Sequence, residues 1–325
     1  MSELRMIDAV RLAMDEAMAT DPSVCLLGED VSSGGPFGAS SELIDRYGPW
    51  RVRDTPISEG TVVGLAVGAA LSGLRPIVEV MFVDFVTLAM DQLVNHAAKL
   101  HYMSGGQLRV PLTVRAQFGA TGSMGAQHSQ SLEAWFVHVP GLKVVVPSTP
   151  ADAHALLRAA IDDDNPVIFL EHRGLYWSRG EVSERPTEER LGVAAVRRPG
   201  KDVTIVAIGA MVARALEAAA LLESEGLDVE VIDPRTLVPL DLDTLIDSVT
   251  RTGRLVIAHE AVTTGGVGAE IAAAIGTRVH GALRAPIRRV GAPPTPVPAG
   301  PELEALYIPS TSTIAEAARQ VAASK

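Results

Sequence analysis

Cysteine is nearly absent from this chain of 325 residues, which holds only Cys25 and so cannot close an internal disulfide. Cys25 lies in the apolar run Val24-Cys25-Leu26-Leu27, a setting that predicts a small core residue in a reducing compartment. The first residues lack the apolar core of a signal peptide, and the most apolar helical stretch, near 58–71, is too short to span a membrane. We therefore expect a soluble, cytoplasmic protein.

Positively charged residues are fewer than negatively charged ones. The chain has 28 Lys and Arg against 39 Asp and Glu, a formal net charge of −11. This balance argues against nucleic acid or an anionic membrane as a partner, and suits a basic protein partner. The length fits two ordinary domains, and a hydrophobic content of 47% allows each domain a large core.

Several common catalytic motifs are missing. The sequence has no Walker loop, no G-x-S-x-G elbow and no H-x-x-x-H pair. These absences disfavour a P-loop nucleotide site, an α/β-hydrolase and a transition-metal site. Gly265-Gly266-Val267-Gly268 lacks the full dinucleotide spacing, so we interpret it as a tight strand-to-helix turn.

Short apolar runs alternate with helical patterns along the chain, which predicts an α/β protein with mainly parallel sheets. A charged stretch over 178–200, containing Glu184-Arg185-Pro186, interrupts this alternation. We place a boundary there, giving domains 1–190 and 191–325. The expected helices are 7–19, 58–71, 85–101, 150–161, 212–224, 242–251, 267–275 and 312–323, and the expected strands are 24–27, 76–81, 111–115, 143–146, 167–170, 203–208, 229–232 and 254–258.

One acid stands at the start of an otherwise apolar helix. Glu59 precedes a stretch without a polar face, and such a helix is typically buried. Gly60, Gly64 and Gly68 recur every four residues and would let another backbone approach closely. We expect the Glu59 carboxyl group to be largely shielded from water, and therefore protonated or bonded to a hydrogen-bond donor. The alternative is an ordinary acid that the helix dipole stabilises.

A long loop rich in Gly, Ser and Gln is expected over 117–131, and it carries His128. Catalytic groups gather on loops of α/β sheets, and an imidazole exchanges protons near neutral pH. The alternative is a surface histidine. His138, before a Pro-Gly stop, fits a helix C-terminal residue, and His259-Glu260 follows a strand without a defined role.

Several segments are familiar when taken together. They are Pro56-Ile57-Ser58-Glu59, Phe82-Val83-Asp84-Phe85, Asp91-Gln92-Leu93-Val94-Asn95, Tyr102-Met103-Ser104-Gly105-Gly106, Gln127-His128-Ser129-Gln130 and Pro140-Gly141-Leu142-Lys143-Val144. In order and spacing the chain resembles the β subunit of the thiamine-diphosphate-dependent 2-oxo acid dehydrogenase component of pyruvate, branched-chain and acetoin dehydrogenase complexes. The resemblance implies a transketolase-like pyrimidine-binding domain followed by a transketolase C-terminal-type domain.

The resemblance also implies roles for five residues. Glu59 would hydrogen-bond the aminopyrimidine ring of thiamine diphosphate and favour its imino tautomer, which a carboxyl group with a raised pKa suits. Phe85 would stack on that ring, Ile57 would line the same pocket, and Glu29 would lie near the cofactor. His128 would face the substrate, stabilise charge, or pass a proton during acyl transfer to a lipoyl arm.

A structural potassium site is implied as well, because hard oxygen ligands suit such an ion. Its ligands would be the carbonyl oxygens of Leu112, Ala160, Ile161 and Asp163, together with Asn165. The alternative is that the polar residues 162–166 simply end a helix.

The family holds the cofactor's diphosphate through Mg²⁺ on a Gly-Asp-Gly segment and a later Asn-Asn pair, and this chain contains neither. The resemblance therefore implies that a separate α chain supplies them, in a tetramer of two α and two β chains with sites at the α–β interface. The glycine-lined helix face would pack on another subunit. The second domain would dock the subunit-binding domain of a dihydrolipoyl acyltransferase.

The implied reaction is that of an oxidoreductase with a disulfide acceptor. It would decarboxylate a pyruvate-like or branched-chain 2-oxo acid, or cleave acetoin, and pass the acyl group to a lipoyl acyltransferase. A split transketolase-like or acyloin-forming enzyme without a lipoyl partner is the alternative. A non-catalytic scaffold would be expected to lack Glu59 or His128, and both are present. Gly122-Ser123-Met124-Gly125 departs from the family pattern and leaves the acyl specificity open.

Overall fold

The computed structural model describes residues 2–183 and 190–324, so Glu184-Arg185-Pro186 at the expected boundary lies outside the described residues. The chain divides into two compact units. The first comprises Met1–Phe118 and Trp135–Leu191, and the second comprises Gly119–Ala134 and Gly192–Lys325. The segment 119–134 thus groups with the second unit, and the division at 190/191 stays our proposal for the domains. In the described part of the chain, every helix is too short or too polar to cross a membrane.

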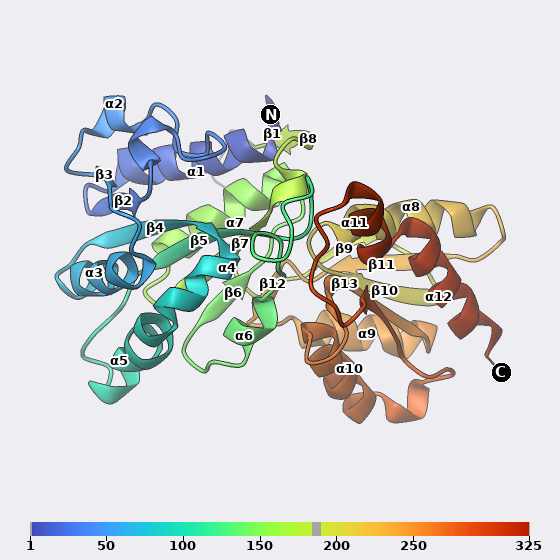
Figure 1. Cartoon of the computed structure of the whole chain (residues 1–325). Coiled ribbons are helices and arrows are strands. Elements are labelled where there is room, and N and C mark those ends of the chain that lie inside the picture. The colour runs from blue at the N-terminus through green and yellow to red at the C-terminus, as the bar shows by residue number, and fades with distance from the viewer. Residues whose placement is uncertain (1, 184–189, 325) are drawn as a thin grey trace. The chain divides into compact units, whose positions relative to one another are not determined.

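The first unit is built on a parallel sheet with the strand order β6-β7-β5-β4-β2-β3 (Figure 1). The inner strands are nearly continuous apolar runs because helices cover both faces. The strands are β2 (Val24–Gly28), β3 (Val52–Asp54), β4 (Arg75–Phe82), β5 (Thr113–Phe118), β6 (Lys143–Val145) and β7 (Val167–His172), with an antiparallel pair β1 (Ser2–Arg5) and β8 (Arg179–Val182) beside them.

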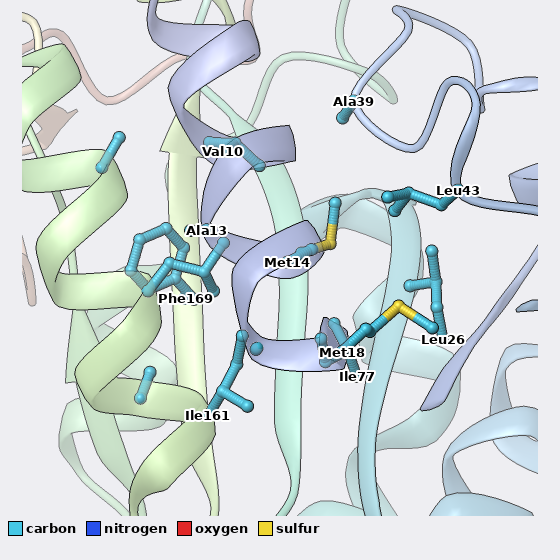
Figure 2. Packing of buried hydrophobic residues seen from close by; sticks show 14 of the residues in the cluster. Val10, Ala13, Met14, Met18, Leu26, Ala39, Leu43, Ile77, Ile161 and Phe169 are labelled. Atoms are coloured by element: carbon cyan, nitrogen blue, oxygen red, sulfur yellow. The ribbon is translucent and has the colours of Figure 1, made fainter. Parts of the chain in front are cut away.

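Two long helices, α1 (Met6–Thr20) and α7 (Pro150–Asp162), lie side by side on one face of this sheet, and α3 (Glu59–Leu71) lies on the other. Met14 and Met18 of α1 reach the core beneath it, as Figure 2 shows. The remaining helical segments here are η1 (Val31–Ser33), α2 (Leu43–Tyr47), α4 (Val83–Val86), η2 (Thr87–Ala89), η3 (Gln92–Ala97), α5 (Ala98–Met103) and η4 (Arg173–Leu175), together with α6 (Glu133–Val137), whose first two residues are grouped with the second unit.

The single helix expected over 85–101 is wrong in detail, because the segment forms a series of short helical pieces with a π-helical turn in η3. Leu93 and Ala97 are buried, whereas Leu88 is 65% exposed. The apolar side is therefore not continuous along the segment. Leu88 lies in the 3-10 turn η2, before the π-helical turn, so the apolar side breaks where one short helical piece gives way to the next.

The expectation that α3 is buried all round is also wrong. Val63 and Val67 are buried against the unit, but Leu65 is 54% exposed and Gly68 is exposed. An all-apolar sequence cannot distinguish a helix that is buried within its own chain from one with a face left open. This open face is available to another molecule.

The three glycines of α3 do not share one open face. A Cβ at Gly60 would lie 3.1 Å from the carbonyl oxygen of Leu88, and one at Gly64 would lie 3.3 Å from Cγ of Gln92. These two glycines therefore let the chain's own 88–92 segment approach. Among the described residues, a Cβ at Gly68 would meet nothing within 4 Å. Of the three glycines, Gly68 is therefore the one that leaves room for another subunit, and this packing stays a prediction.

The second unit repeats the architecture with a sheet of order β14-β13-β10-β11-β9, parallel except for β9. Helices α8 and α12 pack together on one face, and α9 and α10 contact β10 and β13 (Figure 1). The elements are β9 (Ala195–Arg198), β10 (Val203–Ala207), α8 (Met211–Glu223), β11 (Val229–Asp233), β12 (Thr236–Val238), α9 (Leu242–Thr252), β13 (Leu255–Val262), α10 (Val267–Arg278), η5 (His280–Ala282), β14 (Arg288–Ala292), α11 (Pro301–Tyr307) and α12 (Thr311–Ala323). The predicted fold class, with two mainly parallel sheets flanked by helices, is confirmed.

Candidate active site

A cavity of about 330 Å³ opens in the first unit where β2, β3 and β4 end. Ligands of α/β proteins bind outside the carboxyl ends of parallel strands, because the loops that follow the strands meet there. All four residues predicted to contact the cofactor, Glu29, Ile57, Glu59 and Phe85, line this cavity. The structure therefore brings together side chains that lie up to 56 positions apart in the sequence.

Each of these side chains takes its place from the element that carries it. Glu59 is the first residue of α3, and Ile57, two residues earlier, is 80% exposed in the cavity wall. Phe85 belongs to α4 directly after β4, and its ring meets Phe82 edge-on with centroids 5.9 Å apart. Ile57 and Phe85 thus give the cavity an apolar lining suited to a flat heterocycle.

The expectation of a dry Glu59 is not met in this single chain. Glu59 is only half-buried, because the start of α3 faces the open cavity. The acid in the drier setting is Glu29, whose Oε1 is buried and has no hydrogen-bond partner among residues 2–183 and 190–324. Burial raises the pKa of Glu29, and the negative charges of Glu59 and Asp30 raise it further. The two acids of the cavity are thus electrostatically coupled.

The raised pKa of Glu29 gives a pH-dependent prediction for Glu29→Gln. The folded state holds the Glu29 proton more tightly than the unfolded state, so wild-type stability falls as pH rises above the ordinary value of 4.5 through the raised one. We expect Glu29→Gln to be more stable than wild type at about pH 8, and most of the gain to be lost at about pH 4, where the carboxyl is mostly protonated in both states. Urea unfolding at both pH values measures the difference.

The control for this prediction is Glu270→Gln, which neutralises an exposed acid on α10. It should change the unfolding midpoint equally little at both pH values. A gain for Glu29→Gln that does not depend on pH would contradict the assignment of a raised pKa.

A buried ion network that the sequence motifs did not predict lies beneath the cavity. Glu79 of β4 lines the cavity, and its Oε2 accepts a hydrogen bond from Arg115 Nη1 at 2.7 Å. The Nε and Nη2 atoms of Arg115 also donate to the two carboxylate oxygens of Glu171, at 2.7 and 2.8 Å, and the Tyr176 hydroxyl donates to Glu171 at 2.7 Å. Burial raises the pKa of Glu79. The signal in the sequence was one charged residue within each apolar run: Glu79 in β4, Arg115 in β5 and Glu171 in β7.

The Glu29 loop packs directly on this network. A Cβ at Gly28 would lie 2.6 Å from the carbonyl oxygen of Glu79, and one at Gly35 would lie 2.4 Å from Glu79 Oε1. Both positions therefore require glycine, because any side chain would displace the loop from β4. The backbone on both sides of Glu29 is fixed against the floor of the cavity.

His128 lies in the segment 119–134 of the second unit, whereas the four cavity residues belong to the first. Its side chain is half-buried. The His128 backbone N–H donates to the carbonyl of Gly125 at 3.3 Å, and Gly119 N–H donates to Gln130 at 3.2 Å. The loop is therefore closed at its base and turned at its tip, with the histidine just after the turn.

The predicted cation ligands gather around the end of α7, and protein donors already engage their carbonyl oxygens. Arg75 Nη1 donates to the carbonyls of Ile161 and Asp163, at 3.2 Å each. The other bonds run from Thr113 Oγ1 to Ala160 at 3.1 Å, from Val167 N–H to Leu112 at 2.8 Å, and from Asn165 Nδ2 to the Asp163 carboxylate at 2.9 Å. The Asp163 N–H also donates to the Ala160 carbonyl, at 3.3 Å, so two protein donors already use the two acceptor positions of that oxygen.

No cluster of three or more His, Cys, Asp or Glu that could hold a metal ion occurs within residues 2–183 and 190–324. A potassium ion does not need such a cluster, since neutral carbonyl oxygens are its usual protein ligands. The predicted site therefore depends on carbonyl and amide oxygens, and it stays a prediction.

Comparison with known families agrees with this architecture. The model of the transketolase pyrimidine-binding domain matches residues 2–178, and that of the transketolase C-terminal domain matches residues 192–314. A pyrimidine-binding domain of this kind implies binding of thiamine diphosphate. Among solved structures, a chain described as split gene transketolase, inactive beta4 tetramer, is similar with a TM-score of 0.82 and 25% identity over 99% of both chains.

Named relatives are closer in sequence. The β subunit of acetoin:2,6-dichlorophenolindophenol oxidoreductase of Cupriavidus necator is 48% identical, over 96% of this chain and 95% of the relative. The mitochondrial β-2 subunit of the pyruvate dehydrogenase E1 component of Oryza sativa subsp. japonica is 44% identical, over 98% of this chain and 86% of the relative. Names of this kind imply an α partner. This chain therefore belongs to the family of β subunits of thiamine-diphosphate-dependent 2-oxo acid and acetoin dehydrogenases.

Proposed function

We propose that this chain is the β half of a heteromeric enzyme that cleaves a 2-oxo acid or acetoin and passes the acyl group to a lipoyl acyltransferase. The observation that carries the proposal is the cavity of the first unit, which gathers Glu29, Ile57, Glu59 and Phe85. The substrate is pyruvate-like, branched-chain or acetoin. The family spans all three, and the relatives named above include an acetoin oxidoreductase and a pyruvate dehydrogenase.

The cavity fits the pyrimidine end of thiamine diphosphate. Glu29 Oε1 and Thr55 Oγ1 line it as buried polar atoms that have no hydrogen-bond partner in the part of the chain that the structure describes, so a ligand with nitrogen donors would satisfy them. Ile57 and Phe85 supply apolar contact for a ring. When bound, thiamine diphosphate supplies the electron sink for breaking the bond next to the substrate carbonyl.

Two residues of the chain carry the proton chemistry in this proposal. The Glu59 carboxyl, fixed at the start of α3, holds and returns a proton on the pyrimidine side of the cavity. The negative charge of Glu59 in turn helps to raise the pKa of Glu29, the other acid of the cavity. The imidazole of His128 moves a proton during acyl transfer.

An α chain completes the site in this proposal, within a tetramer of two α and two β chains. The sequence has no Gly-Asp-Gly segment and no Asn-Asn pair for a Mg²⁺-bound diphosphate. Gly68 and Leu65 leave an open apolar strip on α3 for a subunit contact. The acidic chain suits the basic subunit-binding domain of a dihydrolipoyl acyltransferase. We also propose that a potassium ion binds the carbonyl oxygens of residues 112, 160, 161 and 163 together with Asn165.

Cofactor binding tests the shared site. We expect the isolated chain to bind thiamine diphosphate with Mg²⁺ at least roughly tenfold more weakly than the same chain mixed with its α subunit, because this chain contacts only the pyrimidine end. Isothermal titration calorimetry measures both affinities, with Mg²⁺ removed by a chelator as the control. Tight binding by the isolated chain would rule out the divided site.

A split transketolase-like or acyloin-forming enzyme is the second candidate, and the likeness to the split gene transketolase favours it. The two functions differ in their acceptor. The reconstituted enzyme should acylate a lipoyl domain at the expense of a 2-oxo acid or acetoin, whereas the second candidate would transfer its two-carbon unit only to an aldehyde.

A further inference from the structure

The loop that carries His128 holds an unusual backbone shape. Gly119, Gly122, Ser123 and Gly125 all have positive φ, between 58° and 91°. Ser123, at 58°, is the one residue of these four with a side chain, and the left-handed conformation is unfavourable for such a residue. The loop therefore needs contacts from the surrounding protein to keep this shape.

The strained residue is held by a buried acid. The Ser123 backbone N–H donates to both carboxylate oxygens of Glu304, at 3.1 Å each. Glu304 belongs to α11 and is 7% exposed, whereas its neighbour Glu302 on the same helix is exposed. A carboxylate accepting from a backbone N–H makes a charge-assisted bond, stronger than a bond between neutral groups. Glu304 thus stabilises the one position that the backbone itself disfavours.

A second buried acid holds the start of the same loop. The Ala120 N–H donates to Oε1 of Glu260 at 2.5 Å, and Glu260, on β13, is 5% exposed. The contact joins residues 140 positions apart. The tip rests on the segment before α11, since a Cβ at Gly125 would lie 3.4 Å from Cβ of Ala299.

These contacts leave His128 little freedom. Only residues 124–127 separate Ser123 from His128, and within them the Gly125 carbonyl accepts from His128 N–H at 3.3 Å. We propose that Glu304, together with Glu260, is a positioning residue that fixes the loop carrying His128 for acyl transfer. The anchoring stands on the contacts alone, and the link to acyl transfer rests on the proposed function.

Hydrogen–deuterium exchange of the full chain tests the anchoring without any activity. We expect Glu304→Ala to speed exchange of the peptide 119–130 about tenfold or more, because the Ser123 amide loses its acceptor and the strained turn opens. Glu304→Gln keeps an acceptor oxygen and should change exchange less. Glu302→Ala is the matched control and should leave this peptide unchanged. Unaltered exchange in both Glu304 variants would overturn the anchoring.

Turnover of the enzyme reconstituted with its α chain tests the positioning. Lipoyl-dependent kcat should fall about 10²-fold in Glu304→Ala, with KM for the 2-oxo acid little changed, and Glu304→Gln should recover part of the loss. In a His128→Ala background, Glu304→Ala should cost little more, because both changes remove the same contribution. Additive losses, or faster exchange with unchanged turnover, would overturn the positioning role.

The two proposals fail in different ways. If the wild-type chain with its α partner shows no lipoyl-dependent turnover, the proposed function is wrong, and the positioning role in acyl transfer is overturned with it. The exchange measurement still decides whether Glu304 holds the loop.

Discussion

Replacing Glu59 with Gln should reduce kcat of the reconstituted enzyme on the order of 10³-fold while the subunits still assemble. The amide has nearly the shape of the carboxyl group, so the start of α3 and the cavity wall should keep their form. It cannot hold and return a proton at that atom, and the proposed mechanism needs this step in every turnover. Steady-state turnover with a 2-oxo acid and a lipoyl domain measures the loss.

The same variant separates the catalytic interpretation from the structural one. If Glu59 only complements the dipole of α3, its neutralisation should cost about 0.3–1 kcal/mol of stability and leave turnover unchanged. Sedimentation of the mixture with α chain checks assembly. The control is Glu270→Gln, an exposed acid in the first turn of another helix, α10. Turnover of Glu59→Gln near the wild-type level would refute the role of Glu59.

Most of the fold could be predicted because apolar periodicity marks buried elements directly. The helix expected over 7–19 is Met6–Thr20, and the strand expected over 167–170 is Val167–His172. Sequence patterns did not predict short strands such as β3 (Val52–Asp54) and β9 (Ala195–Arg198). These strands carry charged and exposed residues, so no apolar run reveals them. Their place in a sheet depends on pairing with a neighbouring strand.

For the cavity, only the residues that line it could be predicted from the sequence. The resemblance singled out Glu29, Ile57, Glu59 and Phe85, and the structure gathers them. Which acid is drier could not be predicted, because it depends on how the Glu29 loop packs over β4. Local patterns likewise cannot pair Ser123 with Glu304, which lies 181 positions later. Contacts of this kind arise from the tertiary fold.

The buried network under the cavity gives the largest expected effect on stability. Arg115 holds Glu79 and Glu171 from the middle of β5, and all three side chains are 5% exposed or less. Arg115→Met would leave both carboxylates buried without a positive partner. We expect a loss of roughly 3–5 kcal/mol in the free energy of unfolding, because an uncompensated buried charge costs more than the pair contributes. Urea unfolding of the isolated chain measures it.

The sign of the pH dependence distinguishes charge from packing. Burial already raises the pKa of Glu79, and loss of Arg115 should raise it further. The deficit of Arg115→Met should therefore shrink as pH falls from about 8 to about 5, since protonation removes the stranded charge. The matched control is Arg319→Met, in an exposed pair with Glu225, which should cost little stability. A deficit that is equal at both pH values would mean that lost packing dominates, and that the Arg115 guanidinium does not act chiefly as a counter-charge beneath the cavity.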